Sequence, residues 1–141
     1  MKNLIITGLL ALSLFAISCK GQPEKKQTVA AVSDNDIEVY YFHNTVRCTT
    51  CLAIESEARK NIEMLYPEMY KEGKISFTSL NLEEEAGRTL GERLGVSGQT
   101  LLIVSGNQKI NITTDGFLYA VAKPDKLREI IKSKVDSLNK E

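Results

Sequence analysis

Two cysteines, Cys48 and Cys51, lie three residues apart at a junction between two patterns of secondary structure. The run before them, residues 37–42, is short, mostly apolar and rich in β-formers, which is typical of a buried parallel strand. The run after them repeats apolar residues at helical spacing from Leu52 to Met69. The chain is therefore restricted to folds that place this pair of thiols between a strand and the start of a helix.

A thiol at that position meets backbone N–H groups that have no partner within the helix, and the positive end of the helix dipole. Both favour the thiolate, which is the species that attacks disulfides or binds soft metal ions. Because the second cysteine can reach back and close a small ring with the first, we interpret Cys48 and Cys51 as a candidate redox centre. A structural disulfide without turnover is the plainer alternative.

The N-terminus has the pattern of an export signal. Lys2 precedes a run of apolar residues, 4–17, that is shorter than the roughly 20 residues a membrane-spanning helix needs. The run ends in Ala16-Ile17-Ser18-Cys19, which resembles the lipobox of bacterial lipoproteins, with Ala16 at the position where leucine is usual. We predict a lipoprotein signal peptide over residues 1–18 and lipidation of Cys19. An ordinary cleaved signal peptide is the alternative.

The number of cysteines fits this interpretation. The chain has three cysteines, and lipidation of Cys19 leaves one pair. Outside the bacterial inner membrane the compartment is oxidising, so that pair is expected to be a disulfide unless it is actively reduced. Residues 19–36 are polar and predict a flexible tether, and residues 37–141 have the size of one domain. We expect a protein of the bacterial cell envelope that faces the periplasm or the cell surface.

Composition gives no indication of nucleic-acid binding, because the formal net charge is zero and no basic stripe is visible. Gly87, Gly91 and Gly95 are spaced by four within a helical pattern and lack the strand–turn–helix setting of a nucleotide-binding loop. We therefore expect no cofactor other than a redox-active disulfide, and we predict no metal ion. We expect a monomer.

The remaining patterns predict the order of elements. Pro67 interrupts the first helix and Gly73 ends it, residues 75–82 alternate as a strand, and residues 83–94 form a helix. Two strands, 100–104 and 109–113, form an antiparallel hairpin, residues 117–121 receive no assignment, and Pro124 begins a last helix over 124–138. The order βαβαββα predicts an α/β fold with a mixed four-stranded sheet and helices on both faces. Right-handed crossovers would place the first and third helices on opposite faces, with Cys48 at the carboxyl end of a strand.

The domain resembles the thioredoxin-like superfamily over essentially its whole length. The resemblance is carried by the C-x-x-C pair, by the order of elements and by the stretch Gly95-Val96-Ser97-Gly98-Gln99-Thr100-Leu101-Leu102-Ile103-Val104-Ser105-Gly106-Asn107. More narrowly, the region around the pair resembles a group of bacterial thioredoxin-like lipoproteins. This resemblance is carried by Tyr41-Phe42-His43-Asn44, followed by Arg47-Cys48-Thr49-Thr50-Cys51-Leu52 and by Glu55. That group carries the family label "nitrophenyl compound nitroreductase subunit ArsF". The resemblance implies thiol–disulfide exchange with protein partners, with electrons supplied by a membrane thiol donor.

Three features depart from the thioredoxin pattern. Thioredoxins have a cis-proline before the third strand, whereas this chain has Gln99 and Thr100, for which we expect an ordinary trans peptide because a non-proline cis bond costs about 2.5–4 kcal/mol. Thioredoxins bury an acidic residue on the first strand, where this chain has residues 40–42, Tyr-Tyr-Phe. Arg47 replaces the tryptophan that precedes the first cysteine. Partner docking and proton transfer are expected to differ accordingly.

The resemblance also implies roles for single residues. Cys48 would be the exposed nucleophile, and Cys51, one helical turn inward, would resolve the mixed disulfide. Arg47 is a candidate for stabilising the Cys48 thiolate, with a solvated side chain as the alternative, and Thr49 and Thr50 would decide how well that thiolate is hydrogen-bonded.

His43, the only histidine, is a candidate proton carrier, although such a residue more often caps a loop. Gln99 and Thr100 are supporting candidates, because they stand where the proline loop would be.

The alternative function is a non-catalytic accessory module that docks a partner or carries a soft metal ion. Two thiolates after a first strand also hold Cu(I) in small metal-binding domains, but in those domains two strands follow the first helix. A structural zinc site needs about four ligands, and only Cys48, Cys51 and His43 are available.

Overall fold

The computed structural model describes residues 36–139. The predicted signal peptide, Cys19 and all of the predicted tether except Asp36 lie outside the described residues. The elements are, in order, β1 (Ile37–His43), α1 (Thr49–Leu65), α2 (Pro67–Lys71), β2 (Ile75–Asn81), α3 (Glu85–Leu94), β3 (Thr100–Ser105), β4 (Gln108–Asn111), α4 (Thr113–Tyr119) and α5 (Pro124–Leu138). None of these helices has the length and apolar character that crossing a bilayer requires.

The four strands form one mixed sheet in the order β2-β1-β3-β4. β1 is parallel to β2, with Ile37 opposite Ile75, and antiparallel to β3, with Val39 opposite Ile103. β4 pairs with β3 as the predicted antiparallel hairpin. Because β1 has a neighbour on each side and helices on both faces, its residues are almost all buried, which explains its nearly continuous apolar sequence. The predicted fold class is confirmed.

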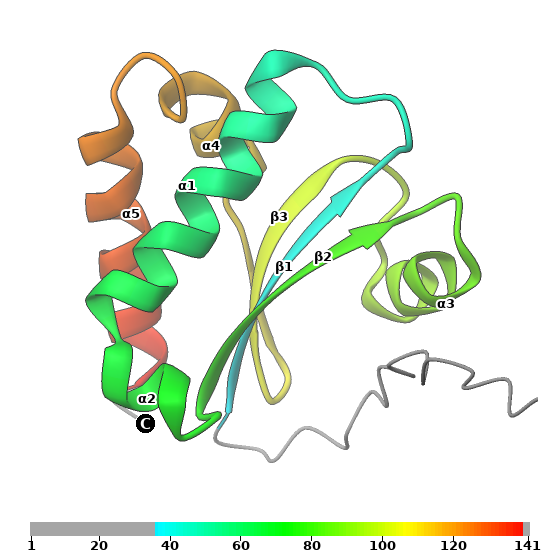
Figure 1. Ribbon diagram of the computed structural model, residues 1–141. Coiled ribbons are helices and arrows are strands. Elements are labelled where there is room, and N and C mark those ends of the chain that lie inside the picture. The colour runs from blue at the N-terminus through cyan, green and yellow to red at the C-terminus, as the bar shows by residue number, and fades with distance from the viewer. Residues whose placement is uncertain (1–35, 140–141) are drawn as a thin grey trace, which may run out of the picture. The chain divides into compact units, whose positions relative to one another are not determined.

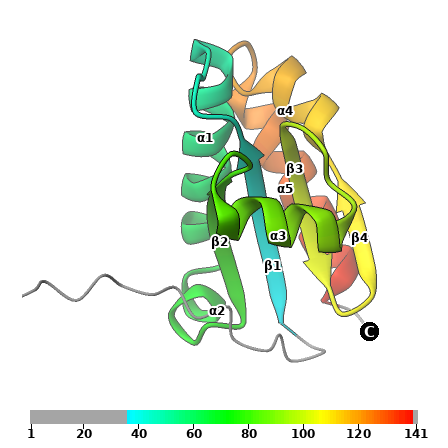
Figure 2. The same ribbon diagram turned by 90° about the vertical axis from the view of Figure 1, so that its right-hand side faces the viewer.

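Successive side chains of β1 enter two separate cores, as the two-residue period of a strand requires. Val39 and Tyr41 lie in the larger core with residues of α1 and α5, whereas Tyr40 and Phe42 lie in a smaller core with Leu90 of α3. Figure 1 shows α1 and α5 side by side on one face of the sheet and α3 on the other. In Figure 2, which is viewed from the side of α3, this helix lies in front of the sheet and runs across its strands.

This arrangement corrects the prediction that the first and third helices lie on opposite faces. The third predicted helix, 124–138, is α5, and it packs beside α1 on the same face. The handedness rule applies to crossovers between parallel strands. α5 follows an antiparallel hairpin, and within residues 36–139 it does not connect two parallel strands, so the rule does not place it. Its buried side chains, Leu127, Ile131 and Val135, join the larger core instead.

Two local predictions have different outcomes. The break at Pro67 is confirmed, because α1 ends at Leu65 and α2 begins with Pro67 at its first position. The strand predicted over 109–113 was wrong at its end, because β4 stops at Asn111 and α4 begins at Thr113. The Asn111 side chain accepts a hydrogen bond from the Thr113 amide at 3.0 Å, which turns the chain into α4. Residues 117–119 of the unassigned stretch belong to that helix.

The glycines of α3 have a packing role. A Cβ atom on Gly87 would lie 2.0 Å from the Asn81 carbonyl oxygen, and one on Gly91 would lie 2.9 Å from the Leu82 side chain. α3 therefore lies so close to the end of β2 that a residue with a Cβ atom would not fit at position 87 without a shift of the backbone. Gly95 then ends the helix in the left-handed conformation with φ of 76°.

Candidate redox site

Cys48 is the residue at which the loop from β1 becomes a helix. Its backbone is extended and its carbonyl accepts a hydrogen bond from the Leu52 amide at 3.1 Å, so Cys48 is the N-cap of α1. Its Sγ accepts a hydrogen bond from the Cys51 amide at 3.3 Å. The structure thus places this sulfur where the sequence predicts, against a helix N–H group that would otherwise have no partner.

Cys48 and Cys51 form a disulfide, with their Cα atoms 5.1 Å apart. The two residues differ in exposure, because Cys48 is exposed and Cys51 is only 3% exposed. Cys51 starts the buried side of α1, which continues with Ile54 and Ala58 into the larger core. An attacking group can therefore reach the outer sulfur, while the inner sulfur is shielded by the fold.

Gln99 contacts the inner sulfur directly. Its side-chain Nε2 donates a hydrogen bond to Cys51 Sγ at 3.3 Å, and its Oε1 lies 3.6 Å from the same atom. When the pair is reduced, this amide can donate to a thiolate or accept from a thiol. Thr100 is buried and its hydroxyl donates to the Gly98 carbonyl at 2.9 Å, which fixes the turn that presents Gln99. No peptide bond is cis among residues 36–139.

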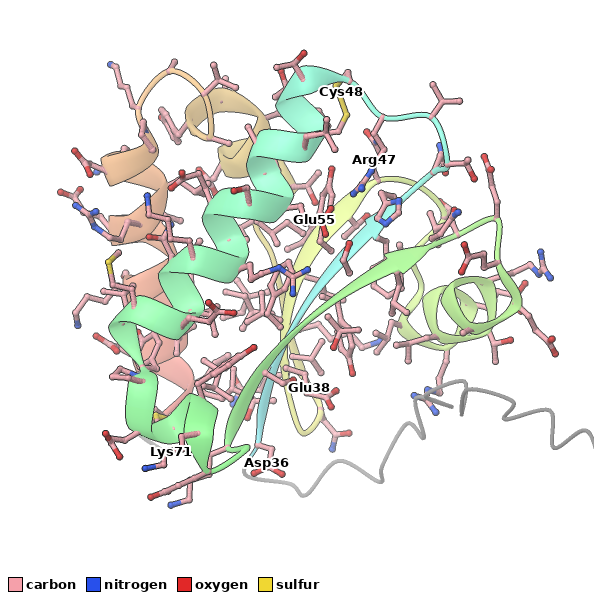
Figure 3. The ribbon with its side chains drawn as sticks, viewed as in Figure 1. Asp36, Glu38, Arg47, Cys48, Glu55 and Lys71 are labelled. Carbon is pink, nitrogen blue, oxygen red and sulfur yellow. A yellow bond between two sulfur atoms is a disulfide. The ribbon has the colours of Figure 1, made fainter. Side chains whose placement is uncertain are left out.

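Arg47 forms an ion pair with Glu55, two turns along α1. Both side chains are partly buried, with 24% of Arg47 and 17% of Glu55 exposed. In Figure 3 the Arg47 side chain extends toward Glu55, whereas the Cys48 sulfur lies above it at the start of the helix. Arg59 binds the other oxygen of Glu55 at 3.2 Å and lies over the Phe77 ring. The carboxylate is thus shared between two guanidinium groups.

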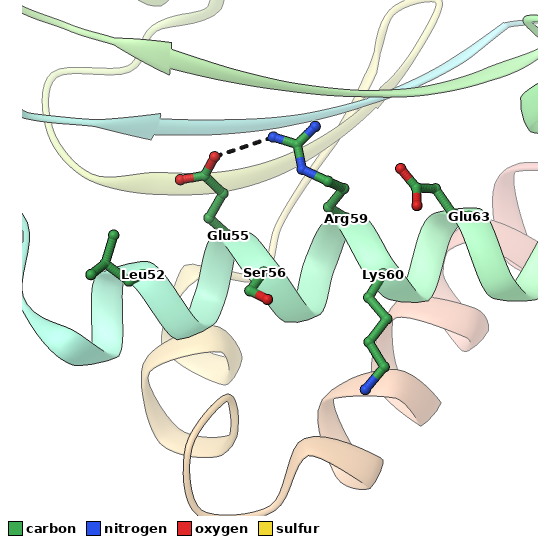
Figure 4. Close-up of a pocket in the computed structure, with 6 residues that line it drawn as sticks. All are labelled: Leu52, Glu55, Ser56, Arg59, Lys60 and Glu63. Carbon is green, nitrogen blue, oxygen red and sulfur yellow. Dashed lines mark hydrogen bonds and ion pairs between the residues drawn. The ribbon is translucent and has the colours of Figure 1, made fainter.

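Figure 4 shows Glu55 and Arg59 on the side of α1 that faces the strands, while Ser56 and Lys60 point away from them. These four residues, with Leu52 and Glu63, line a shallow, open pocket along α1. The pocket contains no cysteine. The pocket is a feature of the surface of α1. The disulfide lies apart from it, at the N-terminus of the same helix.

The environment of Glu55 favours its ionised form. Burial alone would raise the pKa of this carboxyl, but its interactions with Arg47, Ser79 and Arg59 outweigh burial and lower it. The Tyr41 hydroxyl is buried and has no hydrogen-bond partner among the described residues. Burial raises the pKa of Tyr41, opposed by the charge of Arg47 and assisted by that of Glu55. The ionised Glu55 carboxylate thus interacts with the guanidinium groups of Arg47 and Arg59, and the neutral phenol of Tyr41 lies near this ion pair.

The other predicted residues lie around the helix start. Thr49 and Thr50 are the first two residues of α1, and Thr49 is exposed. His43 ends β1, with its ring 6.0 Å from that of Tyr41 and its Nδ1 3.0 Å from the Asn44 carbonyl oxygen. These two contacts of the imidazole ring are with its own strand and loop, while the His43 carbonyl accepts a hydrogen bond from the Leu82 amide at 2.8 Å.

Sequence reasoning did not select Glu55 as a functional residue. Glu55 entered only as part of the motif that carries the narrower resemblance. The available signal was its spacing of four from Cys51, which places both residues on one side of α1. Its partner Arg47 lies outside the helix, so the helical pattern alone could not reveal the ion pair.

No group of three or more histidine, cysteine, aspartate or glutamate side chains is suited to hold a metal ion within the described part of the chain. The arrangement that the structure does provide is a disulfide with one reachable sulfur, set at a helix N-terminus and backed by an amide.

The sheet order, the parallel β1–β2 pair and the C-x-x-C disulfide at the start of α1 define a thioredoxin-like fold. Among solved structures, thioredoxin O2 from Arabidopsis thaliana in its oxidised state is similar, at 17% identity over 73% of this chain and 78% of that one, with a TM-score of 0.48. The germline-specific thioredoxin Deadhead from Drosophila melanogaster is 22% identical over 71% and 82% of the two chains, with a TM-score of 0.45. No family model and no curated protein matches the chain. The assignment of the fold rests on the strand arrangement, and these likenesses carry no argument about activity.

Proposed function

We propose that this protein is an exported, membrane-tethered thiol–disulfide oxidoreductase that acts on protein partners through Cys48 and Cys51. The observation that carries the proposal is the difference between the two sulfurs. Cys48 is exposed and accepts a helix N–H hydrogen bond, whereas Cys51 is buried behind it. A thiolate at Cys48 is stabilised where a partner can reach it.

The exchange takes place in two steps. In the reduced protein, the Cys48 thiolate attacks one sulfur of a partner disulfide, a Cys48–partner bond forms, and the other partner sulfur leaves as a thiolate. The Cys51 thiolate then attacks Cys48 Sγ, the internal disulfide forms, and the second partner sulfur leaves. The partner gains two electrons and the protein loses two, while protons are exchanged with solvent. Another dithiol protein must reduce the pair before the next cycle.

The surface near Cys48 supports a protein as the partner. Val46 is 86% exposed and Leu52 is 49% exposed, and these two residues lie on either side of the disulfide in the sequence. α4 packs beside α1 where a Cβ on Gly116 would touch the Ile54 side chain at 3.3 Å, and Phe117 and Leu118 of α4 are also exposed. Such exposed apolar side chains are typical of a protein contact surface.

The location is proposed from the sequence. Residues 1–18 have the pattern of a lipoprotein signal peptide, Cys19 is the expected lipidation site, and residues 19–36 would connect the lipid to the domain. The narrower resemblance to bacterial thioredoxin-like lipoproteins agrees with a position in the cell envelope. In that setting, a membrane thiol carrier is the expected source of electrons.

Turnover of a disulfide-bonded model protein tests the proposed reaction. With a dithiol reductant in excess, catalytic amounts of the wild-type protein should accelerate reduction of the model disulfide, and Cys48→Ser should abolish the acceleration. If wild type and Cys48→Ser do not differ, the pair is structural or serves an accessory role. Stoichiometric Cu(I) uptake by the reduced protein, lost in Cys48→Ser, would then favour the carrier of a soft metal ion.

A further inference from the structure

Arg47 is the charged residue closest to Cys48 in sequence, yet its charge is held elsewhere. The guanidinium group pairs with Glu55 two helical turns away, in a partly buried setting. Glu55 is fixed in turn by Arg59, whose guanidinium lies 4.7 Å from the centre of the Phe77 ring. Both contacts hold the carboxylate between α1 and the sheet, so that Arg47 is drawn toward the body of the helix.

We propose that Glu55 is a positioning residue that keeps the Arg47 guanidinium away from the Cys48 sulfur and so limits how strongly the outer thiolate is stabilised. This inference rests on the proposed function, because it concerns how the same pair is tuned. A cation beside a thiolate stabilises the reduced form of a cysteine pair and makes the pair more oxidising. By holding that cation, Glu55 shifts the pair toward the role of a reductant.

The charged and titratable groups around Glu55 come from three elements. Arg47 precedes α1, Arg59 lies on α1, and Tyr41 of β1 contributes a buried hydroxyl beside the ion pair. Ser79 of β2 adds a neutral hydroxyl. Glu55 is the only anion among the groups named here. When its charge is removed, none of these other groups can form an ion pair with Arg47.

A double-mutant cycle on Arg47 and Glu55 tests the inference. The readout is the pKa of Cys48 in the reduced full-length protein, taken from the rate of alkylation against pH, which requires no partner and no turnover. Glu55→Gln should lower the pKa of Cys48 by about 0.5–1 unit. Arg47→Gln should then raise that pKa by more in the Glu55→Gln background than in the wild type, because only the released Arg47 can approach the sulfur.

The matched control is Glu57→Gln, which removes a carboxylate on the same helix that pairs with Lys60 at 3.6 Å. It should leave the pKa of Cys48 nearly unchanged. A second readout is the equilibrium with glutathione at a pH above the Cys48 pKa measured for both proteins, where this thiol is ionised in each. There, Glu55→Gln should increase the equilibrium ratio of reduced to disulfide-bonded protein about three- to tenfold. This factor corresponds to the expected change of about 0.5–1 unit in the pKa of Cys48.

Two results would overturn the inference. One is an unchanged or raised pKa of Cys48 in Glu55→Gln. The other is an effect of Arg47→Gln of equal size in both backgrounds, since this would mean that Glu55 does not control the position of Arg47. Because alkylation reports on the thiol itself, either result is distinct from a failure of disulfide exchange with proteins.

Discussion

At the scale of single residues, the two sulfurs of one disulfide lie in different surroundings. Cys48 faces solvent and a backbone N–H, while Cys51 faces the core and the Gln99 amide. The Cys48 position could be expected from the residues alone, because a helix N-terminus is a local feature, whereas Gln99 is a supporting candidate only through the resemblance to thioredoxins. The Gln99 contact joins residues 48 apart in sequence, and it depends on the turn before β3, which no local pattern defines.

Gln99→Met should slow the second step of the exchange. The substitution keeps the length of the side chain but removes the hydrogen bond to Cys51 Sγ, and a hydrogen bond to a charged group contributes about 1.5–3 kcal/mol. Resolution of a mixed disulfide on Cys48 should therefore slow by about 10- to 100-fold, as followed by release of a chromogenic thiol. Gln108→Met, at the exposed start of β4, is the control. Equal resolution rates in the two variants would show that the Gln99 amide has no role.

Glu55 should make the free energy of unfolding of the domain depend on pH in the acidic range. Its pKa in the folded state lies below the ordinary value of 4.5, so its contribution to stability is complete above that pH and is lost as the pH falls through the folded pKa. The difference in the free energy of unfolding between wild type and Glu55→Gln should therefore shrink as the pH falls from 6 to about 3. Urea unfolding at several pH values measures this difference. A difference that stays constant or grows in acid would contradict the assignment.

At the scale of elements, the contact of α3 with the end of β2 depends on Gly87. In an exposed helix, Gly→Ala stabilises by up to about 1 kcal/mol, but here the new Cβ would lie 2.0 Å from a backbone oxygen. We expect Gly87→Ala to destabilise the domain by about 1–3 kcal/mol in urea unfolding. Gly98→Ala, where no atom lies within 4 Å of the new Cβ, is the matched control. Equal stability of the two variants would mean that the approach is looser than the structure shows.

The elements differ in how far their sequences predict them. β1 and α5 have strong patterns, and both were predicted over nearly their full length because burial imposes a clear period on them. α4 could not be predicted, since its seven residues include Gly116 and two exposed apolar side chains that show no helical stripe. The face on which α5 packs was predicted wrongly, because that choice depends on the shared core and not on the order of elements.

At the scale of the whole molecule, attachment to the membrane and redox activity should be separable. The proposed lipid site, Cys19, is distinct from the disulfide-bonded pair. Cys19→Ser should move the protein from the membrane fraction to the soluble exported fraction, since a lipid-free chain lacks the proposed anchor. Its rate of disulfide exchange should stay that of the wild type. Membrane retention of Cys19→Ser at the wild-type level would rule out lipidation as the anchor.

The central claim concerns which sulfur meets the partner, and trapping the mixed disulfide tests it most directly. Each reduced variant is mixed with a peptide disulfide, and covalent adducts are measured by mass spectrometry. Cys51→Ser should accumulate one peptide on Cys48, because the sulfur that would resolve the adduct is absent. Cys48→Ser should remain almost unmodified, because Cys51 is buried. Equal adducts on both variants, or none on Cys51→Ser, would contradict the account.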